Sequence, residues 1–470
     1  MRGWRFHIDR GGTFTDIVAV TPEGRELVRK LLSHNPERYE DAAIEGVQSI
    51  LTDYNAGMND IEVVKMGTTV ATNALLERRG EKVALFITEG FTDALEIGHQ
   101  ARPDIFALKI VKPSRLHTRA FALRERVTAE GEVLIPLNED RLRQDLAQAR
   151  ADGFEACAIA CLHAWAYPRH EQRAGELARE AGFSHVSLSS DMSGLIRLIP
   201  RTDTTVANAY LSPGLQSYTR RIVSAFGAGG RVYFMQSNGG LARANAFDGR
   251  SAILSGPAGG VAGMAAAARG AGFSHSIGFD MGGTSTDVSH FAGSFEHTRD
   301  TVIDGVRIST PMLRIHTVAA GGGSICRFDG ARLRVGPQSA GADPGPACYR
   351  RGGPLTITDC NLVLGRIRTD CFPAIFGPGG DQPPDPEASR ARLRDIASQI
   401  ESAAGSAIPE DVLAQGFIDI ADRHMAEAIR QISIQRGYDP AGYVLCAFGG
   451  AGGQHACAVA DLVGIRTVLL

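Results

Sequence analysis

One short motif occurs twice in this sequence, and the repeat constrains the fold more than any other feature. The first copy, residues 8–17, reads IDRGGTFTDI, and the second, residues 279–288, reads FDMGGTSTDV. When Asp9 is aligned with Asp280, six of nine positions are identical and the last pair keeps a β-branched residue. Because the copies lie 271 residues apart, we interpret them as equivalent parts of two related halves.

Each copy predicts a β-hairpin with a Gly-Gly tip, since apolar residues precede and follow it. Glycine lets backbone N–H groups approach an anion closely, threonine hydroxyls add donors, and flanking carboxylates can hold a divalent cation. One copy alone would equally suit an ordinary glycine-rich hairpin, but two copies that share acids and threonines favour a nucleoside phosphate site. The candidate residues are Asp9, Gly11, Gly12, Thr13, Thr15 and Asp16 in the first copy and Asp280, Gly282, Gly283, Thr284, Thr286 and Asp287 in the second.

Length and composition exclude several classes of protein. A chain of 470 residues exceeds one compact core, so we expect two domains, 1–200 and 201–470. A net charge of −3 gives no basis for a nucleic-acid or membrane surface. No apolar run approaches a membrane span and no signal-peptide core follows Met1, so we expect a cytoplasmic protein. The eight cysteines lack metal-ligand spacing and are expected to be buried, reduced thiols.

Strands and helices alternate through the first half of the chain, which predicts an α/β fold. Residues 83–88 and 156–162 are apolar runs of the kind buried in parallel sheets, and a helix at 170–182 with a strand at 186–189 completes a βαβ unit. Further expected elements are a helix opening at residue 36, a strand entering a helix across 63–77, a helix at 204–226 broken by Pro213-Gly214, strands at 232–236 and 315–318, and a helix at 412–436.

Other glycine-rich segments are candidate ligand-facing turns. Residues 255–260 predict a turn before a helix at 261–269, which either a phosphate site or close helix packing would explain. Residues 339–346 are too rich in glycine and proline to be regular, and something must hold this loop, a ligand being one candidate.

A last glycine turn follows an expected strand at 443–448 and precedes an expected helix at 456–463. Its spacing is not G-x-G-x-x-G, and the acid expected about 20 residues later is not seen because the sequence ends, which weighs against a dinucleotide fingerprint. The sequence ends on a strand without a polar tail, which suggests a longer protein. The candidate ligand-facing residues of this turn are Gly449, Gly450, Gly452 and Gly453.

Taken together, the two hairpins and the late glycine turn resemble the phosphate-1, phosphate-2 and adenosine motifs of the acetate and sugar kinase/Hsp70/actin superfamily. Longer segments resemble the hydantoinase A family, and within it the amino-terminal half of the ATP-dependent 5-oxoprolinases. Arg10 and the tripeptide Gly453-Gln454-His455 favour oxoprolinases over other members of that family. The matching segments are 8–16, 30–42, 255–260, 279–289, 339–350 and 448–457.

This resemblance implies two ribonuclease-H-like lobes, as in actin-like ATPases, with a nucleotide in the cleft between them. The two hairpin tips would cradle the phosphates of ATP, Asp9 and Asp280 would hold Mg²⁺ directly or through water, and the turn 449–453 would lie against the adenosine. Asp16 and Asp287 would orient substrate or metal, although a structural role in each hairpin is an equal alternative. The implied reaction is the hydrolysis of 5-oxo-L-proline to L-glutamate, a cyclic amide being activated by phosphorylation of its carbonyl oxygen.

Full 5-oxoprolinases carry a second, hydantoinase-B-like module credited with ring opening, and its sequence is absent here. The resemblance therefore implies a partner module or subunit, and a homo-oligomer or hetero-oligomer. One alternative is an ATP-dependent hydantoinase or an acetone-carboxylase-type subunit. Another is a nucleotide-binding protein without turnover, which the retention of all four hairpin acids disfavours. A Rossmann oxidoreductase would leave the repeated hairpin unexplained.

Overall fold

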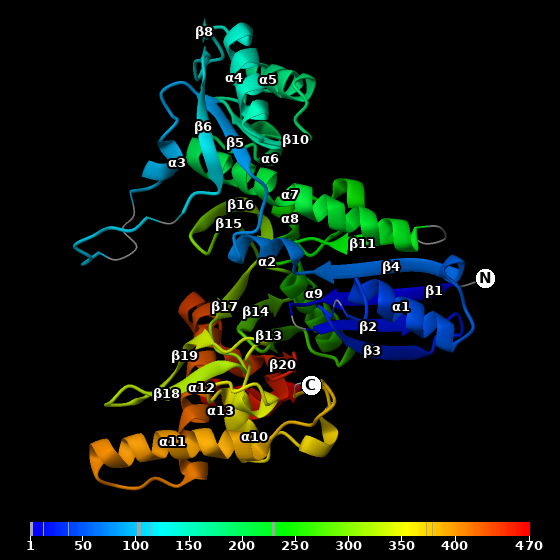
Figure 1. The fold of residues 1–470 in the computed structure, drawn as a ribbon, viewed down its shortest axis with the longest axis vertical. Coiled ribbons are helices and arrows are strands. Elements are labelled where there is room, and N and C mark those ends of the chain that lie inside the picture. The colour runs from blue at the N-terminus through cyan, green and yellow to red at the C-terminus, as the bar shows by residue number, and fades with distance from the viewer. Residues whose placement is uncertain are drawn as a thin grey trace. The chain divides into compact units, whose positions relative to one another are not determined.

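The computed structural model describes residues 3–12, 14–35, 37–100, 105–112, 114–227, 231–372, 374–377 and 379–470. The chain forms two compact units, whose elements are labelled in Figure 1. Unit 1 contains Met1–Gly259 and His297–Leu313, and unit 2 contains Gly260–Glu296 and Arg314–Leu470. Both units combine helices with sheets, as the α/β prediction required.

The first motif copy lies in the main sheet of unit 1, whose strand order is β12-β11-β4-β1-β2-β3 (Figure 1). Strands β1 and β2 are antiparallel with Asp9 opposite Asp16, so the predicted hairpin is confirmed. Strand β3 continues the antiparallel part, whereas β4 runs parallel to β1 and β11 runs parallel to β4. Buried residues Trp4, Phe6 and Ile8 alternate along β1 and anchor the hairpin in the core. The strands are β1 (Trp4–Arg10), β2 (Phe14–Val20), β3 (Glu26–Leu32), β4 (Ile61–Thr68), β11 (Arg231–Met235) and β12 (Leu241–Ala242).

Helix α1 (Ala42–Asp53) packs on this sheet but begins later than predicted. Residues 37–41 are not helical, and the Asp41 carboxylate accepts the backbone N–H groups of Ala43 and Ile44 at 2.9 and 3.4 Å. Aspartate is a strong N-cap because its side chain satisfies N–H groups that lack an intrahelical partner. The cap therefore fixes the start of the helix.

Helix α7 (Leu198–Phe226) continues past Pro213, so the predicted break at Pro213-Gly214 is wrong. Proline removes one N–H donor from a helix, yet residues on both sides of it, including Tyr210 and Tyr218, are buried in the core of unit 1. The Tyr210 carbonyl accepts the backbone N–H of Glu81 at 2.9 Å, which ties this part of the helix to the segment around residue 81. Packing thus outweighs the local helix-breaking tendency.

A second, fully parallel sheet in unit 1 has the order β10-β9-β5-β6. Every residue of β5 and β9 is buried, as predicted for central parallel strands. Strand β6 was not predicted because it lies at the edge of the sheet, and its exposed polar positions interrupt the apolar run. The elements are β5 (Val83–Thr88), β6 (His117–Leu123), β9 (Ala156–Ala160), β10 (His185–Leu188), α4 (Glu139–Ala151) and α5 (Arg169–Glu180).

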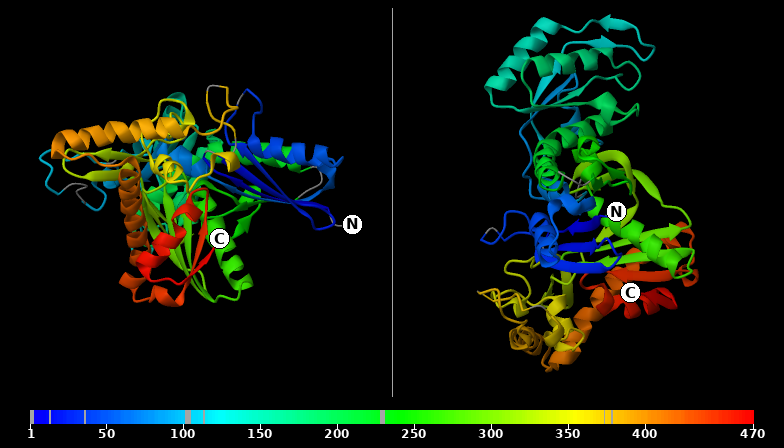
Figure 2. Two further views of the ribbon diagram at one scale, coloured as in Figure 1. Left: turned by 90° about the horizontal axis from the view of Figure 1, so that it is seen from below. Right: turned by 90° about the vertical axis from the view of Figure 1, so that its right-hand side faces the viewer.

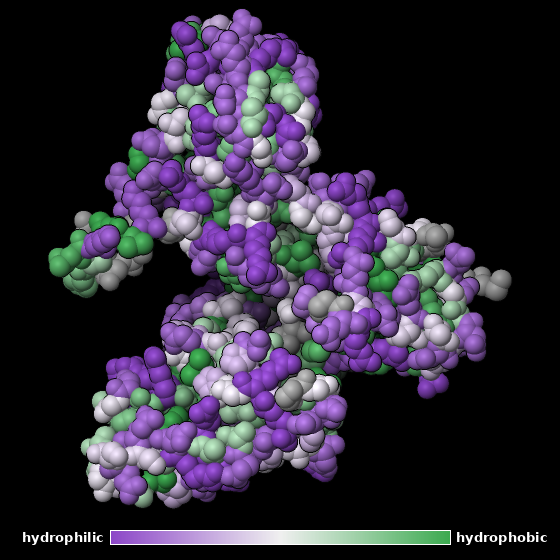
Figure 3. Space-filling model, viewed as in Figure 1, coloured by the Kyte–Doolittle hydropathy of each residue, from purple (hydrophilic) through white to green (hydrophobic). Residues whose placement is uncertain are grey.

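The segment between α3 (Ala94–Ile97) and β6 carries exposed apolar side chains, which form the green group at the left of Figure 3. Ile105, Phe106, Leu108 and Val111 are each at least 69 % exposed. These four side chains therefore lie outside the core of unit 1, whereas Leu116 at the end of the segment packs against it.

The second motif copy lies in the sheet of unit 2, with the order β17-β14-β13-β20-β21 (Figure 1). The last of these strands ends next to the C-terminus, which is drawn in red in Figure 2. Strands β13 and β14 are antiparallel with Asp280 opposite Asp287, so the second hairpin is also confirmed. As in unit 1, the strand before the motif has antiparallel neighbours on one side and two parallel strands on the other. The strands are β13 (His275–Met281), β14 (Thr286–Ala292), β17 (Ile315–Val318), β20 (Val444–Phe448) and β21 (Thr467–Leu469).

Of two long helices in unit 2, the sequence predicted one and missed the other. Helix α12 (Glu410–Ile432) is the predicted long helix, and it ends four residues before the predicted end. Helix α11 (Pro386–Ala404) was not predicted, because many of its residues are charged and it buries few side chains: Ser389, Leu393 and Ile396.

The predicted glycine turn at 255–260 is wrong, since these residues lie inside α9 (Ser255–Gly270).

Glycine at these α9 positions serves close packing, because a Cβ at Gly260 would lie 2.9 Å from the Phe448 ring. The helix after the last glycine turn, α13 (Gly452–Val463), begins at Gly452 and not at residue 456. The remaining elements are α2 (Val70–Leu76), α6 (Ser189–Met192), α8 (Gly249–Ala252), α10 (Ile357–Val363), β7 (Arg126–Val127), β8 (Val133–Ile135), β15 (His297–Ile303), β16 (Val306–Leu313), β18 (Ser324–Phe328) and β19 (Leu333–Ser339).

All eight cysteines are free thiols. Six are buried as expected, whereas Cys371 and Cys457 are exposed, so the expectation was wrong for these two. Among the described residues, no helix is long and apolar enough to cross a bilayer.

We expect acid to destabilise unit 1 through His117, the first residue of β6. Its ring is buried, neither ring nitrogen has a hydrogen-bond partner among the described residues, and burial lowers its pKa from 6.5 to about 4. Between these two pH values the unfolded chain binds a proton that the folded chain does not, so about 3 kcal/mol of stability is lost as the pH falls. The free energy of unfolding should therefore decline less steeply with acid in His117→Phe than in wild type. Parallel curves from pH 7 to pH 4 would contradict this assignment.

Candidate functional site

The tip of the first hairpin is closed by one backbone hydrogen bond, from the Gly11 N–H to the Phe14 carbonyl at 3.0 Å. Gly12 is exposed at the tip, and a Cβ there would lie 3.5 Å from the Asn73 side-chain nitrogen. Thr13, a predicted phosphate ligand, lies outside the described residues. The tip therefore presents glycine backbone beside an amide donor, an arrangement that suits an anion.

Asp9 lies beside this tip, and two glycines from other elements lie next to its carboxylate. Cβ atoms at Gly67 and Gly256 would lie 3.5 and 3.9 Å from Asp9 Oδ1. Within the described part of the chain, no hydrogen bond or ion pair reaches this carboxylate. Asp9 is exposed by surface area, yet enough protein surrounds it that desolvation, with the nearby Asp16 charge, raises its pKa, while Lys30 opposes the shift. A carboxylate that has glycines beside it, and no hydrogen-bond or ion-pair partner among the described residues, suits a divalent cation.

Asp16 is the cross-strand partner of Asp9 but has a different environment. Its two carboxylate oxygens lie 2.5 and 2.7 Å from Lys30 Nζ, and both side chains are nearly half exposed. Such a surface pair contributes little to stability. The structure therefore places Asp16 beside the candidate cation ligand, with its charge partly neutralised by Lys30.

Thr15 supports the tip from inside. It is fully buried, and its hydroxyl lies 2.9 Å from Ser33 Oγ, which donates to the Gly11 carbonyl at 2.7 Å. The predicted hydroxyl donor thus acts on the hairpin itself. Ser33 was missed by the sequence analysis, because nothing in a strand-end serine indicates that it reaches a glycine 22 residues away.

The tip of the second hairpin repeats the same closure, with the Gly282 N–H donating to the Ser285 carbonyl at 3.0 Å. Gly283 and Thr284 are exposed, and no hydrogen bond from the described residues reaches their N–H groups. The glycine segment 321–323 supports the tip from behind: Gly322 donates to Gly282 and Gly323 donates to Gly283, at 3.0 and 2.6 Å. The free N–H groups therefore point away from a fixed backbone.

Thr286 matches Thr15 in its role. It is fully buried, and its hydroxyl donates to the Ala320 carbonyl at 2.5 Å. Asp287 accepts the Thr317 hydroxyl at 2.5 Å, and desolvation raises its pKa although this hydrogen bond opposes the shift. Asp280 lies opposite Asp287 in the hairpin.

Unit 2 also brings the last glycine turn against the second hairpin. The Ala451 N–H donates to the Met281 carbonyl at 2.9 Å. Gly449 has a φ of +81°, and a Cβ there would overlap Asp280 Oδ1 and lie 2.6 Å from the Met281 carbonyl oxygen. Of the other predicted residues, Gly450 and Gly453 are exposed at the start of α13, whereas Gly452 is buried. The turn thus packs directly against Asp280 and Met281.

A buried carboxylate holds the two residues that directly follow the glycine-proline loop 339–346. Asp359 is fully buried and accepts the backbone N–H groups of Ala347 and Cys348 at 3.1 and 2.8 Å and the Ser389 hydroxyl at 2.7 Å. The end of the loop is therefore fixed by a side chain of the protein. Asp359 was missed because its partners are distant in sequence.

A second buried polar group fixes the start of α13. His455 is fully buried, with Nδ1 2.6 Å from Asp422 Oδ1 and Nε2 2.9 Å from Asn361 Nδ2. The Asn361 amide nitrogen also donates to Gln454 Oε1 at 3.0 Å. These bonds position the helix that follows the glycine turn.

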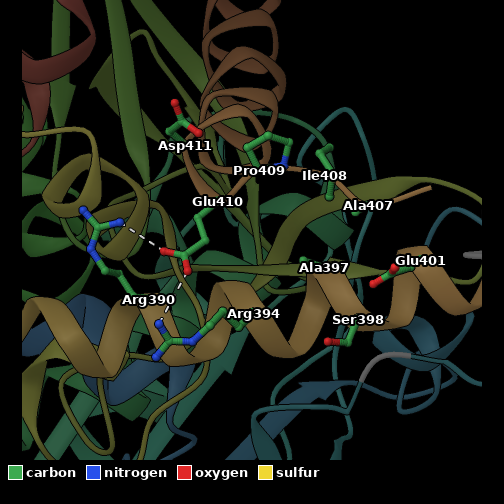
Figure 4. A pocket seen from close by; sticks show the side chains of 10 residues that line it. All are labelled: Arg390, Arg394, Ala397, Ser398, Glu401, Ala407, Ile408, Pro409, Glu410 and Asp411. Carbon is green, nitrogen blue, oxygen red and sulfur yellow. Dashed lines mark hydrogen bonds and ion pairs between the residues drawn. The ribbon is translucent and has the colours of Figure 1, made fainter.

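A surface hollow of about 800 Å³ lies between α11 and the start of α12, and Figure 4 shows the residues that line it. Its cations are paired: Arg390 and Arg394 lie 3.0 and 3.5 Å from the Glu410 carboxylate. None of the predicted site residues lines it. Elsewhere too, the described residues contain no group of three or more side chains that could hold a metal ion.

Comparison with known proteins identifies the family. The model of the hydantoinase/oxoprolinase N-terminal region matches residues 5–182, and the hydantoinase/oxoprolinase model matches residues 201–470. The chain belongs to the hydantoinase/oxoprolinase family. The predicted family membership is therefore confirmed.

Relatives within the hydantoinase/oxoprolinase family match nearly the whole chain. It is 44 % identical to 5-oxoprolinase 1 of Arabidopsis thaliana and 43 % identical to 5-oxoprolinase of Saccharomyces cerevisiae, covering 99 % of this chain in both cases. The chain spans only 40 % of the length of either relative.

Two solved structures share the fold. The ATP-dependent caprolactamase from Pseudomonas jessenii gives a TM-score of 0.83 at 33 % identity, covering 99 % of this chain and 68 % of that one. The nucleotide-free acetone carboxylase gives a TM-score of 0.81 at 26 % identity, covering 100 % of this chain and 68 % of that one.

The contact between Gly449 and Asp280 predicts a position-specific effect of alanine. Gly449→Ala should lower the free energy of unfolding by at least about 1–2 kcal/mol, because a Cβ meets both a left-handed backbone and the Asp280 carboxylate. Gly450→Ala is the matched control, since no atom lies within 4 Å of its Cβ position, and it should change stability by less than about 0.5 kcal/mol. Denaturant unfolding of both variants checks this, and equal effects would contradict it.

Proposed function

We propose that this chain is the ATP-binding, substrate-activating part of an ATP-dependent 5-oxoprolinase, which converts 5-oxo-L-proline to L-glutamate. The observation that carries the proposal is the 44 % identity to a 5-oxoprolinase along 99 % of this chain. Identity to the caprolactamase structure is 33 % and to acetone carboxylase 26 %, so a hydantoinase-like or carboxylase-type role is less well supported.

In this proposal the chain has two ribonuclease-H-like lobes, of the actin-like type, with a nucleotide between them. The matching strand order around each motif copy supports two related lobes. The expected division into residues 1–200 and 201–470 follows the family models, which match 5–182 and 201–470. The compact units divide the chain elsewhere, since residues 201–259 and 297–313 belong to unit 1 and supply β11 to the sheet of the first motif copy.

ATP and Mg²⁺ fit the residues that the hairpins offer. Gly11, Gly12, Thr13 and the corresponding Gly282, Gly283 and Thr284 would contact the phosphates through backbone N–H groups and hydroxyls. Mg²⁺ commonly uses one or two carboxylates and completes its shell with water and phosphate oxygens. Asp9 and Asp280 meet this need without a larger acidic cluster, and the bound ion would neutralise charge on the phosphates. The turn at 449–453 would contact the adenosine.

The hydrogen bonds that fix each hairpin tip suggest roles for the predicted threonines and for the second aspartate of each motif. Thr15 and Thr286 would hold the phosphate-binding backbone in place and not contact ATP, because both hydroxyls are used internally. Asp16 and Asp287 would orient the substrate or the metal. Phosphoryl transfer asks mainly for in-line positioning and charge neutralisation, which such rigid tips provide.

The chemistry explains why a lactam hydrolase would use ATP. A lactam is a poor electrophile, so its carbonyl oxygen first attacks the γ-phosphorus, forming an O–P bond while the bond to ADP breaks. Water then adds to the activated carbon, and the ring C–N bond breaks with its electron pair going to nitrogen. A second water hydrolyses the resulting acyl phosphate to the side-chain carboxylate of glutamate and inorganic phosphate.

A hydantoinase-B-type module or subunit would complete the reaction by opening the ring. The curated relatives extend well beyond the region matched here, and a relative at 35 % identity is named caprolactamase subunit alpha. We therefore place this chain in a hetero-oligomer, or in a longer polypeptide that contains the second module.

Phosphate release tests the proposal directly. The chain with a hydantoinase-B-type partner should release phosphate from MgATP when 5-oxoproline is added, and much less with hydantoin or acetone. Faster release with hydantoin or acetone would favour the other family activities. MgATP binding without release in every mixture would favour a nucleotide-binding protein that lacks turnover.

The variant Asp9→Asn should distinguish an effect on phosphate release from an effect on folding. Loss of the proposed metal ligand should lower phosphate release by at least about 100-fold. The same change should leave the melting temperature equal or higher, because the raised pKa of Asp9 means that its ionised form destabilises the folded state at neutral pH. A lower melting temperature together with lost activity would instead indicate misfolding.

A further inference from the structure

Arg10 is the last residue of β1 and directly precedes the first glycine tip. Its carbonyl accepts both the backbone N–H and the hydroxyl of Thr69, at 3.1 and 3.2 Å. Two hydrogen bonds therefore fix the backbone from which this side chain extends.

The Arg10 guanidinium lies over the ring of Tyr218 on α7, 5.1 Å from the ring centroid. The Tyr218 hydroxyl in turn donates to Met66 Sδ at 3.7 Å, which fixes the ring against β4. Arg10 Nε is buried without a hydrogen-bond partner, and among the described residues no carboxylate lies within ion-pair distance of this guanidinium. Its charge is thus held in place but not compensated.

Arg221 provides an internal comparison. Its guanidinium lies over the same ring, 5.6 Å from the centroid, yet it pairs with Glu40 and Asp41 at 3.3 and 3.4 Å. Two arginines therefore share one tyrosine, and among the described residues only Arg221 of the two is paired with carboxylates. A cation–π contact holds the guanidinium over the face of the ring but leaves its N–H donors without acceptors.

The geometry of the strand separates Arg10 from the candidate metal ligand. Successive side chains of a strand point to opposite faces, so Asp9 and Arg10 leave β1 on different sides. Asp9 faces Gly67 and Gly256, whereas Arg10 faces Tyr218. An anion bound by Arg10 would therefore be distinct from phosphates held on the Asp9 side, yet close to the same tip.

We propose that Arg10 binds the carboxylate of the cyclic-amide substrate and so selects lactams that carry an acid group over lactams that lack one. The planar fork of a guanidinium matches a carboxylate with two parallel hydrogen bonds. This inference rests on the proposed function, since it takes 5-oxoproline as the substrate. It adds the recognition of the substrate's charge, which the glycines, threonines and aspartates of the two motif copies do not provide.

The test uses the complete enzyme, this chain with its hydantoinase-B-type module, and two substrates. One is 5-oxoproline, and the other is 2-pyrrolidinone, the same ring without the carboxylate. Arg10→Gln should raise KM and the directly measured Kd for 5-oxoproline about 10- to 100-fold, the loss of one charged hydrogen-bonded pair. Its kcat/KM for 2-pyrrolidinone and its Kd for MgATP should stay within about twofold of wild type.

Two further variants sharpen the result. Arg10→Lys should recover part of the affinity, because it keeps the charge but loses the fork. Arg221→Gln should leave both substrates unchanged, since Arg221 is already paired. Melting temperatures of all variants identify any that fail to fold.

Other outcomes overturn the assignment in distinct ways. Equal weakening of both lactams, or of MgATP, in Arg10→Gln would assign Arg10 to the phosphates. No change in any constant would leave Arg10 as a structural partner of Tyr218. If wild type binds 5-oxoproline without turnover, the proposed function fails while the binding measurements still decide the role of Arg10. If wild type does not bind 5-oxoproline, both proposals fail.

Discussion

A single backbone hydrogen bond, between the first glycine of each motif and the carbonyl three residues later, is the constraint on which both candidate sites depend. It joins Gly11 to Phe14 and Gly282 to Ser285, at 3.0 Å in each case. The bond forces the chain to reverse at the glycines, which leaves neighbouring N–H groups outside the strand ladder. Those groups can bind a ligand only if the turn stays rigid, so the elements around each tip act mainly as supports.

The supports differ although the tips are alike. A buried threonine hydroxyl lies beneath each tip, but Thr15 acts through Ser33, whereas Thr286 bonds directly to the Ala320 carbonyl. The second tip also has the segment 321–323 hydrogen-bonded behind it. The motif is thus alike in both halves while its supports differ, and the order and direction of the strands next to β1 and β13 are the same.

The sequence predicted the features that depend on nearby residues. Both hairpins, the buried strands β5 and β9 and the α/β class follow from local patterns, and the structure confirms them. The predictions that were wrong concern elements that depend on contacts with distant residues. Helix α7 continues past Pro213 because it is packed in the core, and α11 buries too few residues to show a helical pattern. Among site residues, Ser33 and Asp359 escaped notice because their hydrogen bonds join segments 11 to 30 residues apart.

The buried carboxylate of Asp359 has a consequence for how unit 2 opens. It accepts hydrogen bonds from the loop that follows β19, from Thr356 at the start of α10 and from Ser389 on α11. Releasing any one of these segments would remove hydrogen bonds from a carboxylate that is fully buried. Protected amide hydrogens in the three segments should therefore share one free energy of opening, as one cooperative unit and not as three independent fluctuations.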